Sequence, residues 1–149
     1  MMTEYWIWLS RTLGAGAKIG DMISYFGSPR EMYEAGRNEW KLSGLLTAKQ
    51  ISSLSKFSPS ESYSIFKACE QNRWHIIDFD SSFYPALLRD LPDFPAVLFA
   101  DGDYKVLKSA VPIAFVGTRK ASEYSKKIAY KLSFSVAGSG AVIVSGGAL

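Results

Sequence analysis

The sequence predicts an α+β chain in two parts, a helical region over residues 1–72 and the start of a parallel α/β sheet over residues 73–149. Three observations support this prediction. Apolar residues recur at helical spacing through the first part. Short apolar runs, each ending at a turn, dominate the second part. The last two of these runs enclose one long amphipathic stretch, which is the pattern of a strand, a helix and a strand.

The composition restricts the classes of function. The 149 residues are 48% hydrophobic and 21% charged, as in soluble globular proteins, and no apolar run is long enough to cross a bilayer. The N-terminus lacks the basic start and long apolar core of a secretory signal. Cys69 and His75 are single residues of their type, which argues against a disulfide framework, a metal site or a Ser-His-Asp triad. We expect a cytoplasmic protein with no cofactor, and the net charge of +3 is compatible with nucleic acid.

Start and stop signals locate the helices of the first part. The stretch "IGDMISYF" predicts a helix that stops at Gly27, and "REMYEAG" predicts a second helix that ends at Gly36. In "LTAKQISSLSKF", Thr47 is an expected N-cap. In "SPSESYSIFKACEQN", Ser58 precedes a proline at the first helical position.

Two junctions in this region resemble each other. "LGAGAKIGDMI" and "LSGLLTAKQIS" each place a glycine-containing turn between apolar residues and a new helix. That is the outline of a helix-hairpin-helix unit, whose turn amides can hold a DNA phosphate. It is also the outline of a compact bundle whose glycines only permit tight turns, and this second interpretation is favoured.

The second part begins with two expected strands. "WHIIDFD" predicts the first, and "AVLFADGD" predicts another that ends in a turn over residues 101–103. Between them, Pro85, Pro92 and Pro95 exclude one continuous helix. We expect His75, within the first strand, to be a structural or surface residue.

A β-α-β unit follows. Residues 113–116 are suited to a strand buried on both faces, and residues 141–144 to a second buried strand. Ser122 and Gly138 are the expected N-cap and stop of the helix between them. Its apolar stripe consists of residues at intervals of four, namely Tyr124, Ile128, Leu132 and Val136.

Parallel strands bring the turns after both strands to one edge of the sheet, and these turns favour an anion. The first turn supplies cationic side chains, the second supplies glycines that permit close backbone approach, and the helix start adds free N–H groups. Neither the dinucleotide pattern nor the P-loop pattern is present. Arg119 is expected to point into the crevice, whereas Lys126, Lys127 and Lys131 are expected to form a solvated helix face. The predicted phosphate-binding or DNA-binding residues are Gly117, Thr118, Arg119, Lys120, Ser122, Ser145, Gly146 and Gly147.

Three stretches, in this order and spacing, resemble the DNA-processing protein A family, also called DprA or Smf. They are "DFDSSFYPALLRDLPDFPAVLFADGD", "IAFVGTRKASEYS" and "AVIVSGGAL". The helical region is similar to the SAM-like, helix-hairpin-helix-like domain that often precedes the family's core. The resemblance covers essentially the whole chain and is strongest from Asp78 onwards.

The resemblance implies a cytoplasmic bacterial protein that binds single-stranded DNA and loads the RecA recombinase during natural transformation. It implies a Rossmann-like core that holds DNA, with no catalytic residue and with a possible homodimer in the full-length protein. By motif match, Gly117, Thr118 and Arg119 correspond to the basic pocket that holds the DNA backbone. Residues 145–147 correspond to the neighbouring turn, and Lys120 is adjacent to the pocket.

The sequence departs from the family pattern in two places. Ser125 stands where the family usually has a glycine, and the chain stops at Leu149, whereas the family core continues through further strands. A pair of parallel strands should not be stable alone, so we expect a fragment with a truncated core and an incomplete DNA pocket.

Two alternatives remain open. A Rossmann-type enzyme similar to nucleoside-monophosphate phosphoribohydrolases would also hold phosphate at glycine-rich strand ends. The Pro-Gly-Gly-x-Gly-Thr stretch of those enzymes does not occur in this sequence. Alternatively, the N-terminal helices form a protein-interaction domain with no DNA contact.

Overall fold

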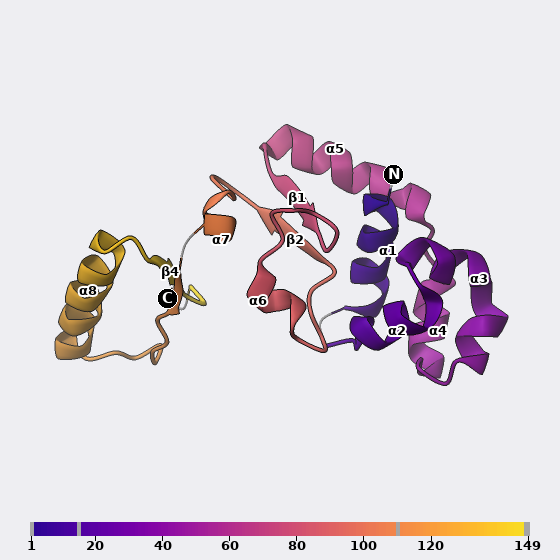
Figure 1. Cartoon of the computed structure of the whole chain (residues 1–149), viewed down its shortest axis with the longest axis horizontal. Coiled ribbons are helices and arrows are strands. Elements are labelled where there is room, and N and C mark those ends of the chain that lie inside the picture. The colour runs from indigo at the N-terminus through magenta and orange to yellow at the C-terminus, as the bar shows by residue number, and fades with distance from the viewer. Residues whose placement is uncertain (1, 15, 110, 148–149) are drawn as a thin grey trace. The chain divides into compact units, whose positions relative to one another are not determined.

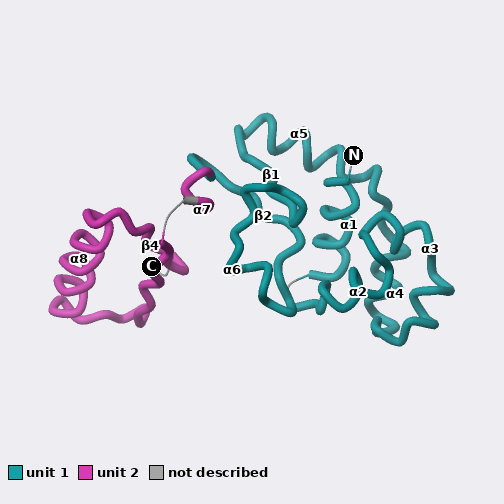
Figure 2. The backbone as a smooth tube through the Cα atoms, viewed as in Figure 1, with its two compact units in different colours: residues 1–104 teal, residues 105–149 magenta. Residues whose placement is uncertain are grey.

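The structure is a computed structural model that describes residues 2–14, 16–109 and 111–147. The chain forms two compact units, residues 1–104 (unit 1) and residues 105–149 (unit 2), as Figures 1 and 2 show. The α+β prediction is confirmed, because the chain combines helices with one antiparallel and one parallel pair of short strands.

Unit 1 begins with helices; α2 to α5 start close to their expected positions, and α1 precedes them without a specific prediction. Their bounds are α1 Thr3–Leu13, α2 Ile19–Phe26, α3 Pro29–Leu42, α4 Ala48–Leu54, the 3-10 turn η1 Pro59–Glu61 and α5 Ser62–Asn72. The predicted stop of α2 is confirmed, since Gly27 follows it with φ +91°, a conformation that glycine adopts without steric cost. The predicted N-cap of α4 is confirmed as well. The Gln50 backbone N–H donates to Thr47 Oγ1 at 3.2 Å, and the Thr47 N–H donates to Gln50 Oε1 at 2.9 Å.

The helix predicted to end at Gly36 breaks there and is followed directly by a second helical segment. Gly36 has a non-helical backbone (φ 76°, ψ −177°), but the chain resumes its helical course and α3 runs on to Leu42. Trp40 anchors the second segment, because its indole ring is buried and its Nε1–H donates to the Met32 carbonyl oxygen at 2.6 Å, across the kink. The helical backbone therefore does break at Gly36 as predicted, and a second helical segment that Trp40 anchors on the core completes α3.

Helix α1 is the centre of unit 1, with α3, α4, η1, α5 and both strands packed against it (Figure 1). Four consecutive residues of α1 are almost fully buried, so this helix is enclosed on all sides rather than on one stripe: Trp6, Ile7, Trp8 and Leu9. The buried indoles keep their N–H groups satisfied. Trp8 Nε1–H donates to the Phe57 carbonyl oxygen at 3.0 Å, and Trp6 Nε1–H donates to Asp80 Oδ2 at 2.6 Å.

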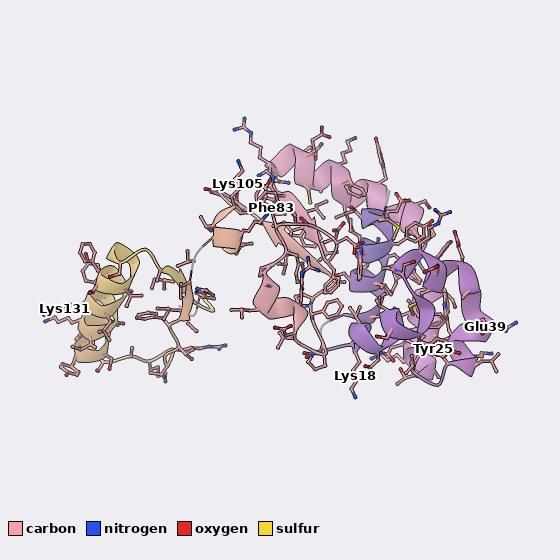
Figure 3. All side chains as sticks on the ribbon, in the orientation of Figure 1. Lys18, Tyr25, Glu39, Phe83, Lys105 and Lys131 are labelled. Carbon is pink, nitrogen blue, oxygen red and sulfur yellow. The ribbon has the colours of Figure 1, made fainter. Side chains whose placement is uncertain are left out.

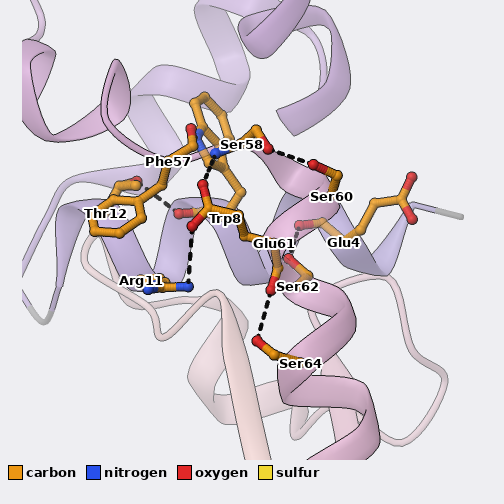
Figure 4. Close-up of polar contacts among 10 residues, drawn as sticks. All are labelled: Glu4, Trp8, Arg11, Thr12, Phe57, Ser58, Ser60, Glu61, Ser62 and Ser64. Carbon is orange, nitrogen blue, oxygen red and sulfur yellow. Dashed lines mark hydrogen bonds and ion pairs between the residues drawn. The ribbon is translucent and has the colours of Figure 1, made fainter.

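Polar contacts join the η1 turn and the start of α5 to α1 (Figure 4). Arg11 lies 3.9 Å from Glu61, and the Ser62 hydroxyl donates to the Glu4 carbonyl oxygen at 3.1 Å. Glu61 also caps its own turn, since its carboxylate accepts the Ser58 N–H at 2.9 Å. The expected helix start at Ser58 therefore begins as a 3-10 turn that leads directly into α5.

The hairpin of β1 (His75–Asp78) and β2 (Val97–Ala100) is antiparallel, with Ile77 opposite Leu98, and the short helix α6 (Ala86–Arg89) lies in its connection. The hairpin packs on α1, and Thr3 Oγ1–H donates to Asp78 Oδ2 at 2.6 Å. Phe94 and Val97 belong to the same buried cluster as the helices. These contacts group residues 73–104 with the helices, and the division of the chain after residue 72 stays a prediction about folding units.

Unit 2 contains α7 (Val106–Ser109), β3 (Pro112–Ala114), α8 (Glu123–Gly138) and β4 (Val142–Val144). The predicted β-α-β unit is confirmed, because β3 and β4 are parallel and Ile113 pairs with Ile143. The predicted cap of α8 is also confirmed, since Ser122 Oγ accepts the Ser125 N–H at 3.2 Å.

The predicted burial within unit 2 is not observed. Residues of β3 are exposed, and Val116, expected inside the strand, lies beyond it with 95% of its surface exposed. Tyr124, Ile128 and Leu132 are exposed rather than forming a buried stripe. Residues four positions apart are offset by about 40° around the helix axis, so the apolar stripe winds around α8. Two three-residue strands therefore cannot cover its whole length.

Among the described residues, no helix is long and apolar enough to cross a membrane.

Candidate nucleic-acid interface

The parallel pairing of β3 and β4 places the ends of both strands at one edge. Beyond the last paired residues, the Phe115 N–H donates to the Val144 carbonyl oxygen at 2.8 Å, so the pairing continues into the chain that leaves β3. The turn over residues 117–120 and the turn over residues 145–147 therefore begin at the same edge of the sheet. The topology alone is sufficient for this juxtaposition.

The first turn is exposed and locally ordered. Gly117, Thr118, Arg119 and Lys120 are all exposed, and the Lys120 N–H donates to Thr118 Oγ1 at 3.3 Å. A Cβ atom added at Gly117 would meet no atom within 4 Å, so this glycine leaves open space beside the backbone. The turn thus presents its backbone and two cationic side chains to solvent.

Ser122 acts as the cap of α8 in this structure. Its Oγ accepts the Ser125 N–H and lies 2.9 Å from the Ser125 hydroxyl. Ser125 is the residue that departs from the family pattern, and its side chain completes the cap instead of disturbing the helix start. The N-terminus of α8 keeps the positive end of its dipole beside the first turn.

The second turn contributes backbone rather than charge. The Gly147 N–H donates to Ser145 Oγ at 3.4 Å, and Gly147 has φ +63°, the left-handed region that glycine occupies readily. A Cβ atom at Gly146 would meet nothing within 4 Å. Both turns therefore leave room for a ligand to approach the main chain.

Charge is divided unequally between the two units. Residues 105–149 carry seven Lys or Arg residues and one acid, Glu123, whereas residues 1–104 carry ten basic and thirteen acidic residues. Unit 2 therefore has a net charge of +6 and unit 1 a net charge of −3. The charge difference between the two units can be counted from the sequence once their boundary is known, but the net charge of +3 for the whole chain does not reveal it. A polyanion is attracted to unit 2.

Arg119 is available for a ligand. Within the described part of the chain it forms no ion pair, and neither does Lys120. The single acid of unit 2 is already engaged, since Glu123 Oε1 accepts a hydrogen bond from Lys126 Nζ at 2.7 Å. An unpaired guanidinium on an exposed turn can form paired hydrogen bonds to phosphate oxygens.

Unit 1 offers weaker support for a ligand. An open cavity of about 480 Å³ lies between α1, α5 and β1, lined by residues that include Tyr63, Lys67, Glu70, Trp74 and His75. None of the predicted site residues lines it, and its one lysine is matched by one glutamate. His75 is exposed, as expected for a surface residue, and its ring lies 4.4 Å from that of Tyr104.

The two glycine-containing junctions of unit 1 are turns between helices. Gly16 and Gly44 have φ values of +79° and +68°, which explains the need for glycine at both positions by turn geometry alone. DNA binding at these junctions stays a prediction. In the described residues, no group of three or more His, Cys, Asp or Glu side chains could hold a metal ion.

Comparison with known proteins agrees with this geometry. The sequence model of the DNA recombination-mediator protein A family matches residues 75–149, from the start of β1 through both turns. The DNA processing protein DprA of Bacillus subtilis (strain 168) is 37% identical over 82 residues, which cover 55% of this chain and 28% of that protein. The protein Smf of Escherichia coli (strain K12) is 33% identical over 101 residues, covering 68% of this chain and 27% of that protein.

The chain thus spans about a quarter of the length of the curated relatives it matches. The family match covers half of the chain and includes both glycine turns of the β-α-β unit. The predicted family is confirmed, and the chain belongs to the DNA recombination-mediator protein A family.

Proposed function

We propose that the protein acts in DNA recombination as a binding module for single-stranded DNA, which it holds at the edge formed by the turns after β3 and β4. One observation carries the proposal most directly. The exposed and unpaired Arg119 lies on a glycine turn at the end of a parallel strand, in a unit with a net charge of +6.

The chemistry of the edge suits a nucleic-acid backbone. Phosphate groups carry one charge per nucleotide, and their contacts with Lys and Arg supply most sequence-independent affinity. Arg119 and Lys120 provide the charge, while the turns at Gly117 and Gly146 permit close approach to the main chain. This role requires no cofactor and no catalytic group, and the family assignment favours it over the nucleotide-hydrolase alternative.

The partners belong to the same proposal. A recombination mediator that holds single strands would deliver them to the RecA recombinase, in the cytoplasm, during natural transformation. A homodimer would bring two such edges together. The rate at which RecA nucleates on single-stranded DNA tests this role. A faster rate in the presence of the protein than in its absence would support the role, and an unchanged rate would contradict it.

Substitution of Arg119 tests the site. Arg119→Ala should weaken binding to oligonucleotides of every sequence by about ten-fold, because it removes a phosphate contact and not a base contact. The slope of log K against log salt concentration should decrease in magnitude by about 0.7, the value for one phosphate contact on a single strand. Fluorescence anisotropy over a salt series measures both quantities.

Arg37→Ala is the matched control. Arg37 is an exposed arginine of α3, in acidic unit 1, so its removal changes the net charge equally but should leave the affinity nearly unchanged. An Arg119→Ala variant that binds as tightly as the unchanged chain would refute the assignment of Arg119.

A further inference from the structure

Helix α8 carries two aromatic side chains on its solvent side. Tyr130 and Phe134 are 70% and 71% exposed, and their rings stack one turn apart with centroids 6.2 Å apart and planes inclined by 22°. A surface helix usually presents polar residues on this side, because only its other face packs on the sheet. The pair therefore has no role in the observed core of unit 2.

The position of the pair around the helix confirms that it faces away from the strands. Ser133 and Val136 are the half-buried residues of α8, and α8 contacts β4. At about 100° per residue, the centre of the surface formed by Tyr130, Phe134 and the neighbouring lysines lies roughly 140° from that buried side. Figure 3 shows Lys131 extending from α8 on the side opposite β4.

Two lysines share this face with the rings. Lys127 lies one turn before Tyr130 and two turns before Phe134, and Lys131 lies between the two aromatic residues in the sequence. In the part of the chain that the structure describes, neither lysine forms an ion pair, in contrast to Lys126 with its bond to Glu123. Like charges four residues apart oppose helix formation by a few tenths of a kcal/mol. The stacked rings contribute only a local pair to the helix, and the lysine pair opposes helix formation. Neither feature packs unit 2 together, so the joint presence of exposed rings and unpaired lysines on one face points to a ligand.

We propose that Lys127, Tyr130, Lys131 and Phe134 form a second nucleic-acid contact, a platform on which bases of a single strand stack while the lysines meet its phosphates. Exposed aromatic rings flanked by cations are the recurring solution for binding single strands without sequence preference. The net charge of +6 on unit 2, whose single acid is already paired, favours this polyanion over an acidic or neutral partner surface. The inference rests on the proposed DNA-binding function and adds base contacts to the backbone contact of Arg119.

The experiment compares the whole chain and its variants for binding to oligo-dT and to an abasic deoxyribose-phosphate strand of equal length. Tyr130→Ala and Phe134→Ala should each weaken oligo-dT binding at least about five-fold, as expected for the loss of one stacked base. The same variants should bind the abasic strand as the unchanged chain does, because no base is present to stack.

Conservative variants separate stacking from other causes. Tyr130→Phe keeps the ring and should retain affinity, whereas Phe134→Leu keeps apolar bulk without a ring and should lose affinity as Phe134→Ala does. Lys127→Gln and Lys131→Gln should each reduce the salt slope by about 0.7. Tyr63→Leu, which alters a 75% exposed helical tyrosine of unit 1, is the control and should change nothing. Because all these side chains are exposed, far-ultraviolet circular dichroism should show an unchanged fold.

The outcomes distinguish this inference from the proposed function. Loss of affinity in Arg119→Ala with unchanged affinity in both ring variants would overturn the platform and leave the proposed function intact. Full affinity in Phe134→Leu would also overturn it, since that result indicates an apolar docking face instead of stacking. Failure of the unchanged chain to bind either strand would refute the proposed function and the platform together.

Discussion

The substitution Phe94→Ala tests whether residues 73–104 and the N-terminal helices fold as one body. Phe94 is 4% exposed, and its ring stacks on that of Phe79 with centroids 4.2 Å apart. It also packs against α2, because a Cβ atom added at Gly20 would lie 3.5 Å from Phe94 Cε1. Removal of the Phe94 ring therefore leaves a cavity between the loop before β2 and helix α2, which lies more than sixty residues earlier in the sequence.

The expected loss of stability is large. Deletion of a buried phenylalanine ring lowers the free energy of unfolding by about 3–5 kcal/mol, the sum of lost transfer energy and the cavity that remains. With urea m-values of about 1–3 kcal/mol/M for small proteins, the midpoint of unfolding should decrease by at least about 1 M. Phe94→Leu, which keeps most of the volume, should cost less than about 1.5 kcal/mol and remains measurable if the alanine variant does not fold.

Tryptophan fluorescence is the appropriate assay. All four tryptophans lie in residues 1–104, and three of them, Trp6, Trp8 and Trp40, are buried on helices α1 and α3. Their emission reports unfolding of the helices without a contribution from unit 2. Leu87→Ala is the control, because Leu87 lies in the same segment as Phe94 but is 66% exposed, and its loss should change stability by no more than about 0.5 kcal/mol.

The result that would refute this reasoning is a Phe94→Ala variant whose fluorescence midpoint equals that of the unchanged chain. The helices would then unfold independently of the hairpin, and the predicted division after residue 72 would describe the folding units better than the shared core does.

Three further predictions concern unit 1. Thr47→Ala removes the capping box with Gln50 and should lower stability by about 1 kcal/mol, seen as a melting temperature about 4–8 °C lower by circular dichroism. Burial raises the pKa of Tyr84 to about 12, and its hydroxyl donates to the Pro95 carbonyl oxygen at 2.7 Å, so absorbance titration should show one late-ionising tyrosine. Since the folded state keeps this proton longer than the unfolded state, stability should fall as the pH rises from about 10 to about 12, and Tyr84→Phe should remove that dependence. Burial also raises the pKa of the Cys69 thiol, so its reaction with a disulfide reagent should be slow in the native protein and accelerate in step with urea unfolding.

Local chemistry in the sequence was sufficient for the element boundaries that depend on neighbouring residues. Thr47 and Ser122 cap the helices at which they were expected, because an N-cap hydrogen bond spans only three residues. The stop at Gly27 follows from the same short range. The parallel arrangement of β3 and β4 was predictable too, since a strand, a helix and a strand have essentially one favourable handedness.

Boundaries and burial that depend on distant residues were not predictable in this way. The second helical segment of α3, after the break at Gly36, is anchored by Trp40, and a helix stop signal contains no information about such an anchor. The spacing of apolar residues in α8 predicts a buried stripe, but the burial of a helix depends on how much sheet surface lies beneath it. The sequence predicts a solvated helix face for Lys126, Lys127 and Lys131. That the rings of Tyr130 and Phe134 share the face of Lys127 and Lys131 becomes evident only from the exposure of these rings in the structure.

By itself, the sequence determined the family, the α+β class, most helix starts and the order of the two glycine turns, because each depends on local residue chemistry or on motifs in series. Only the tertiary structure decided that the β1–β2 hairpin shares its core with α1, and that the exposed rings and free lysines of α8 lie on one face. Packing is a property of surfaces that meet after the chain has folded. Residues far apart in the sequence create those surfaces together, and no single stretch of the chain encodes them.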